Sequence, residues 1–184
     1  MEKSVLSVLN GYPQPLIDQV RQLIDQGKLG ERLRQRYPQT HDIRTDRALY
    51  DHVQALKARY MRSAPPLSKV VFDGTLRLTQ QALGTHTRIS RVQGGQLKAK
   101  REIRIARLFR LAPEPMLAMI VVHELAHLKE REHDSAFYAL CQHMLPDYHQ
   151  LEFDTRLYLI DQDLQAQTTP TTQPGSEPEP ASSL

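Results

Sequence analysis

Two histidines flank a glutamate with the spacing of a helical metal site, in the run HELAH at residues 123–127. In a helix, His123 and His127 project from one face with Cβ atoms about 5–6 Å apart, so both imidazoles can reach one ion. Neutral imidazole suits Zn²⁺, and a catalytic zinc site takes three protein ligands and leaves a fourth position open. The run therefore predicts a zinc site that needs a third ligand.

His133 is the predicted third ligand. It lies six residues beyond His127, after a short polar stretch that can turn the chain back. A histidine ahead of a helix can also be a capping or surface group. Other residues with ligand atoms lie nearby, namely Glu130, Glu132, His143 and His149.

Glu124 follows the first predicted ligand and points beside the ion rather than at it. There its carboxylate can accept a proton from a water activated by zinc, which makes Glu124 the predicted general base of a hydrolase. The surrounding helix is strongly apolar, and burying these polar groups is costly unless they share a partner such as a metal. Tyr138 and His143 are the candidates for stabilising the transition state.

Positive charge is concentrated in one segment, although the net charge is only +3. Eight basic residues and one acidic residue lie between Arg88 and Arg110. Lys98, Lys100 and Arg104 share one face of a predicted strand and could bind the phosphates of a nucleotide, or could simply be solvated. The same face could contact DNA or RNA, but interleaved stacking aromatics are lacking, so nucleic acid ranks third.

The elements expected to position these groups are helical at both ends with strands between them. Helical periodicity, capping residues and prolines predict helices over about 15–29, 45–63, 114–129, 134–145 and 148–163. Alternating patterns predict strands over 69–72 and 75–79, joined by an Asp73-Gly74 hairpin turn, and a half-exposed strand over 97–105. Gly30 is expected to end the first helix.

The chain of 184 residues has room for one domain, expected over 1–163, with a helical part over 1–64 and the sheet and catalytic helices over 65–163. Residues 164–184 have almost nothing apolar to bury and predict a disordered tail. The N-terminus lacks a secretory pattern, so a cytoplasmic location is expected. The single cysteine, Cys141, is expected to be a small buried hydrophobe.

The stretch VVHELAHLKEREHDSAFYALCQHMLPDYHQ resembles the YgjP-like metallopeptidase family, whose pattern is HELxH, a third histidine six residues later, then a small or polar residue and an aromatic. The resemblance implies that His123, His127 and His133 bind zinc and that Glu124 is catalytic. It also implies an α+β, minimal zincin-like fold, in which a small twisted sheet packs on the active-site helix. The SprT-like and WLM metalloproteases are similar.

For function, the resemblance implies peptide hydrolysis, with the peptide adding as a strand along the edge over 97–105. Similar proteins are also described as nucleoside triphosphate pyrophosphatases that convert UTP to UMP and pyrophosphate. The phosphates would then contact Lys98, Lys100 and Arg104. A nucleic-acid-associated protease of the SprT type is the third possibility.

Overall fold

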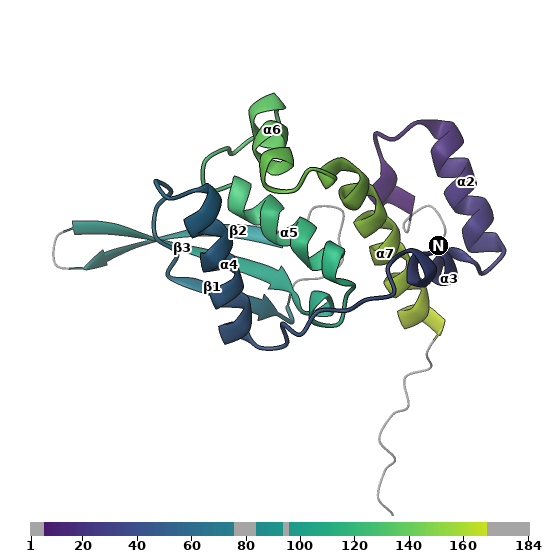
Figure 1. The fold of residues 1–184 in the computed structure, drawn as a ribbon, viewed down its shortest axis with the longest axis horizontal. Helices are drawn as coiled ribbons and strands as arrows, with labels where there is room; N and C mark the ends of the chain where they lie inside the picture. The colour runs from purple at the N-terminus through teal and green to yellow at the C-terminus, as the bar shows by residue number, and fades with distance from the viewer. Residues whose placement is uncertain (1–5, 76–83, 94–95, 169–184) are drawn as a thin grey trace, which may run out of the picture.

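Helices and one small sheet follow one another along the chain as Figure 1 shows. The computed structural model describes residues 6–75, 84–93 and 96–168, with side chains at 6–75 and 101–168. The strands are β1 (Lys69–Asp73), β2 (Gly84–Gln93) and β3 (Gln96–Ala106). The helices are η1 (Leu6–Leu9), α2 (Gln14–Asp25), α3 (Leu29–Arg36), α4 (Asp46–Tyr60), η2 (Arg107–Arg110), α5 (Glu114–Ala126), α6 (Ser135–Met144) and α7 (Tyr148–Thr168).

The strand predicted over 97–105 is confirmed as β3, and it is the central strand of the sheet, whose order is β1-β3-β2. β1 pairs with β3 in parallel from Glu102 to Ala106, and β2 pairs with β3 in antiparallel orientation. The β2–β3 hairpin extends beyond the end of β1 (Figure 1). Because β1 occupies the β3 edge over 102–106, a peptide cannot add along the whole edge expected for it.

The Asp73-Gly74 segment behaves differently from the predicted hairpin turn. β1 pairs in parallel with β3, which comes much later in the chain. Asp73 Oδ1 accepts hydrogen bonds from the backbone N–H (2.7 Å) and the hydroxyl (2.6 Å) of Thr75, so the turn residue fixes a local bend. Most of the predicted partner strand, 76–79, lies outside the described residues.

The predicted helix over 15–29 is two helices. Gly27 has a φ of +65°, which side-chain-bearing residues rarely adopt, and the chain turns there between α2 and α3. Gly30 was wrongly predicted to stop the helix: it lies inside α3, where a Cβ would collide with the carboxylate of Asp161 on α7. Its lack of a side chain serves close helix packing.

The four other helix predictions are confirmed with shifts at their ends. Thr45 caps α4 by accepting a hydrogen bond from the Ala48 amide (3.1 Å), and Asp134 caps α6. α5 ends at Ala126, three residues earlier than predicted. α7 continues to Thr168, so the predicted tail does not begin at 164; residues 169–184 lie outside the described part.

The helices α4 and α5 lie on one face of the sheet (Figure 1). Ile103 and Ile105 on β3 are fully buried toward these helices, and α7 packs against α5. Nearly every residue of α5 is buried, as expected for a helix that is apolar on all sides. The fold is therefore α+β and minimal zincin-like, with the HExxH helix at its centre.

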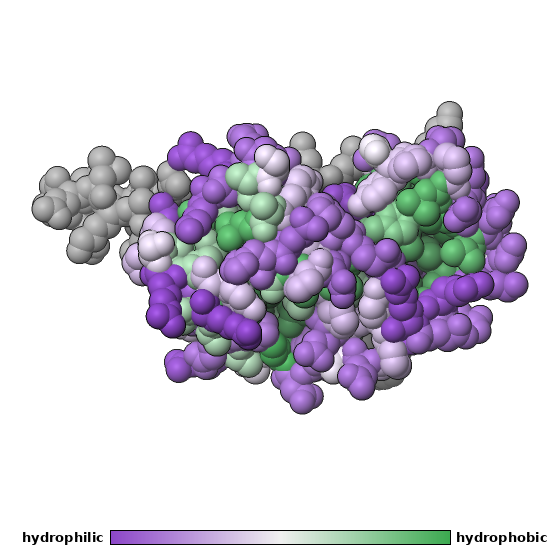
Figure 2. Space-filling view, turned by 45° about the horizontal axis from the view of Figure 1, so that its top comes forward, coloured by the Kyte–Doolittle hydropathy of each residue, from purple (hydrophilic) through white to green (hydrophobic). Residues whose placement is uncertain are grey.

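Residues of α2, α3 and α7 line an apolar groove of about 460 Å³. Figure 2 shows apolar surface gathered in a hollow. The residues that line the groove include Val20, Leu33 and Leu157. None of the three histidines lines it. Within the described residues, no helix has the length and apolar character needed to cross a membrane.

The N-cap residue of α6, Asp134, is predicted to stabilise the start of this helix, and substitution can test that prediction. Asp134 Oδ1 accepts hydrogen bonds from the amides of Ala136 and Phe137, both at 3.0 Å. Asp134→Ala should lower the free energy of unfolding by about 1 kcal/mol, whereas Asp134→Asn keeps an acceptor and should lose less. Urea denaturation with a chelator present separates this effect from metal binding. Equal stability of Asp134→Ala and the wild type would contradict the assignment.

Candidate metal centre

Three histidine nitrogens converge at the C-terminal end of α5. The Nε2 atom of His127 lies 3.2 Å from that of His123 and 3.1 Å from that of His133, and the His133 and His123 nitrogens are 3.2 Å apart. His123 is on the last turn of α5, His127 is its C-cap, and the following turn returns the chain so that His133 directly precedes the α6 cap. Within the described residues, these three histidines form a cluster that could hold a metal ion.

The tautomer of His127 follows from its other ring nitrogen. His127 Nδ1 lies 3.0 Å from the carbonyl oxygen of Glu130, which can only accept, so Nδ1 carries the proton. His123 Nδ1 lies 2.7 Å from the Tyr148 hydroxyl. Burial lowers the pKa of His123 to about 3, helped by the neighbouring histidines, and burial also lowers the pKa of His127. Both rings are neutral at pH 7, and the Nε2 of His127 presents a lone pair to the cluster.

The Nε2 lone pair of His127 would repel a lone pair on the neighbouring Nε2 atom of His123 or His133. A cation between them removes the repulsion. Tetrahedral zinc with nitrogens at 2.0–2.1 Å places those nitrogens about 3.3 Å apart, close to the separations observed here. The residues present therefore fit a small divalent cation bound by three imidazoles.

Glu124 is buried beside this cluster, with 1 % of its surface exposed. Its Oε2 atom has no hydrogen-bond partner among the described residues, and burial raises the pKa of the carboxyl to about 8. An isolated buried carboxylate is costly, and a nearby cation would favour its charged form. An unpaired carboxylate oxygen on the residue that follows His123 is a candidate general base for water.

Phe137 forms an aromatic wall for the three imidazoles. Its ring lies 5.1, 4.6 and 4.7 Å from the ring centres of His123, His127 and His133, and the side chain is fully buried. It restricts the positions of the rings and excludes water from one side of them. Phe137 is the aromatic residue of the motif pattern, so the sequence contained a signal for it.

The other predicted candidates are Tyr138 and His143 on α6 and His149 on α7, and they have different neighbours. Tyr138 is half-buried with its ring centre 6.5 Å from that of His133, so it borders the cluster. His143 instead packs edge-on against Tyr60 of α4 at 5.5 Å, and His149 packs against Tyr138 at 5.1 Å. Of the two residues predicted to stabilise a transition state, Tyr138 is the one beside the metal ligands.

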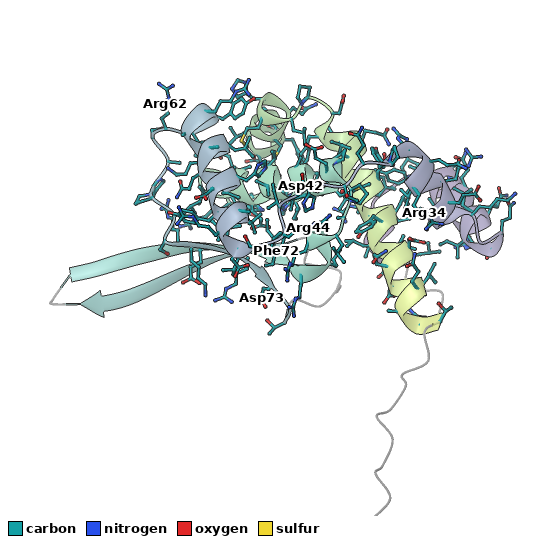
Figure 3. The ribbon with its side chains drawn as sticks, turned by 60° about the horizontal axis from the view of Figure 1, so that its bottom comes forward. Arg34, Asp42, Arg44, Arg62, Phe72 and Asp73 are labelled. Atoms are coloured by element: carbon teal, nitrogen blue, oxygen red, sulfur yellow. The ribbon has the colours of Figure 1, made fainter. Side chains whose placement is uncertain are left out.

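Arg104 lies away from the cluster and already has partners. Its guanidinium donates to Asp73 Oδ2 at 2.8 Å and to Glu102 Oε2 at 3.1 Å. Because side chains alternate along a strand, Arg104 faces away from buried Ile103 and Ile105, and Figure 3 shows Asp73 on the sheet side away from α4 and α5. Lys98 and Lys100 are on the same strand, but their side chains lie outside the described part.

The pattern of the sequence gave no indication of Tyr148. It is the first residue of α7, fully buried, and its pKa is raised by that burial. One and two helical turns further along, Glu152 binds Arg156 at 2.9 Å, and Arg156 also donates to the Val8 carbonyl at 3.0 Å. These contacts tie α7 to the N-terminal segment, and only the packing of α7 on α5 brings Tyr148 to the site.

Comparison with known proteins agrees with this geometry. Residues 85–155 match the family described as "YgjP-like, metallopeptidase domain", a range that contains all three histidines and Glu124. A UTP pyrophosphatase from Escherichia coli (strain K12) is 60% identical over 156 residues, which cover 85% of this chain and 93% of that protein. No solved structure matches the chain. The chain belongs to the YgjP-like family.

Proposed function

We propose that this protein is a zinc-dependent hydrolase that cleaves a nucleoside triphosphate, with UTP as the first candidate substrate, to a monophosphate and pyrophosphate. The proposal rests on the three converging imidazole nitrogens beside the unpaired oxygen of Glu124. The substrate class comes from the relative named UTP pyrophosphatase, whose identity of 60% extends over most of both chains.

In this mechanism His123, His127 and His133 hold the metal through their Nε2 atoms. Bound zinc supplies a Lewis acid that lowers the pKa of water and polarises a phosphoryl oxygen. Glu124 accepts the proton of the attacking water. The water oxygen bonds to the α-phosphorus, and the bond to the oxygen that bridges the α- and β-phosphates breaks, releasing pyrophosphate. Tyr138, whose ring centre lies 6.5 Å from that of His133, is the candidate to donate to a phosphoryl oxygen.

Positive charge for the phosphates is proposed to come from Lys98 and Lys100 on β3. Arg104 was predicted to share this role, but its guanidinium already binds the carboxylates of Asp73 and Glu102. It would have to exchange those partners to bind a phosphate. We therefore assign the phosphates first to the lysines.

Peptide hydrolysis is the second candidate, because the matched family is described as a metallopeptidase domain. The same histidines and Glu124 would serve it, with water attacking a carbonyl carbon. β1 occupies the β3 edge over 102–106, so only the part of the predicted edge before Glu102 is left for strand addition.

Metal content tests the ligand set directly. The purified protein should contain about one zinc per chain, and His123→Ala, His127→Ala or His133→Ala should each lose most of it, because two imidazoles do not complete the site. His143→Ala is the matched control, since this histidine packs on Tyr60 and should leave zinc content unchanged. Absence of bound metal in the wild type under metal-replete conditions would refute the zinc proposal.

Glu124→Gln tests the general base without changing side-chain size. The variant should keep its zinc, because Glu124 is not among the clustered ligands, and should lose roughly 10²–10⁴-fold in turnover number. Parallel measurement of zinc content and turnover separates loss of the base from loss of the metal. A variant with wild-type turnover would show that another group accepts the proton.

Parallel assays with UTP and casein distinguish the two chemistries. We expect pyrophosphate release from UTP that disappears in Glu124→Gln. Lys98→Ala combined with Lys100→Ala should raise the KM for UTP, whereas Lys28→Ala, an exposed lysine between α2 and α3, should not. Casein cleavage without UTP hydrolysis would reverse the assignment, and an unchanged KM in the double variant would exclude the strand lysines.

A further inference from the structure

We infer that Tyr148 is a positioning residue whose hydroxyl fixes the tautomer and ring orientation of His123 and thereby sets the affinity of the metal site. This inference rests on the proposed function, because it concerns the metal that the three histidines would hold. It adds a residue outside the motif, carried by a different helix.

The contact between Tyr148 and His123 is short and fully enclosed. The hydroxyl oxygen lies 2.7 Å from His123 Nδ1, the two rings are inclined by 18°, and Tyr148 is 0 % exposed. The opposite nitrogen of the same ring, Nε2, faces His127 and His133. A phenolic oxygen that accepts from Nδ1–H leaves the Nε2 lone pair pointing into the cluster.

The buried thiol of Cys141 on α6 interacts electrostatically with the Tyr148 hydroxyl. A hydroxyl can donate or accept, so the Tyr148 oxygen must accept from Nδ1–H for the Nε2 of His123 to present a lone pair to the cluster. The Tyr148 O–H must therefore point away from His123.

His123 and His127 are supported in different ways. His127 Nδ1 donates to the main-chain carbonyl of Glu130, three residues away, and no side-chain substitution at Glu130 removes that acceptor. His123 depends on a side chain 25 residues away in the sequence. Groups that hold the second nitrogen of a metal-binding histidine typically change metal affinity 10–100-fold when removed. The support of His123 is therefore the one that substitution can remove.

Tyr148→Phe removes the hydroxyl and keeps the ring. We expect its zinc dissociation constant, measured by competition with a chromophoric chelator, to rise 10–100-fold. Tyr158→Phe is the matched control: Tyr158 is also on α7 and buried, but its ring packs on Phe109 at 6.3 Å. It should keep wild-type affinity. Thermal unfolding of the metal-free proteins checks that both variants are folded.

The outcomes separate the inference from the proposed function. If the wild type binds zinc and Tyr148→Phe binds it equally well, the inference is wrong and the metal site stands. If the wild type binds no zinc, both fall. Should Tyr148→Phe not fold, long-range ¹H–¹⁵N NMR of the metal-free wild type decides: a proton on Nδ1 of His123 supports the inference, and a proton on Nε2 overturns it.

Discussion

The convergence of three imidazole nitrogens within 3.1–3.2 Å of one another is the constraint on which the rest of the site depends. Nε2 lone pairs that face one another in this way repel, and Glu124 adds a buried oxygen without a described partner. Such an arrangement is unfavourable by itself and becomes favourable around a divalent cation. The protein must therefore hold the rings in place with other interactions.

Those interactions come from elements on several sides of the cluster. α5 is buried on all sides between the sheet and α7, so the backbone that carries His123 and Glu124 has little freedom. Phe137 restricts all three rings, and the main chain at Glu130 orients His127. Asp134 fixes the start of α6 directly after His133. The site is built on packed helices and capped turns, which favours a preformed geometry.

The proposed metal ligands and general base do not by themselves select the substrate, because the same groups can direct water at phosphorus or at carbon. The charged side chains around the site therefore decide which substrate binds. The sequence suggested a continuous basic strand face. In the structure Arg104 is paired with Asp73 and Glu102 on the sheet face away from the catalytic helix. The relative named UTP pyrophosphatase nevertheless favours the nucleotide. The basic side chains that would bind the phosphates therefore have to be identified independently of the metal ligands.

The sequence by itself determined the features that rest on local spacing. Residues four apart on a helix share a face, so His123, Glu124 and His127 could be placed together, and the caps Thr45 and Asp134 could be recognised. Only the tertiary structure decided the pairing of β1 with β3, the ion pair of Arg104 with Asp73 and the approach of Tyr148 to His123. These contacts join residues 25 or more positions apart, and they depend on how whole elements pack. Gly30 shows the same limit: its local pattern suggested a helix end, but the proximity of Asp161 explains why glycine is there.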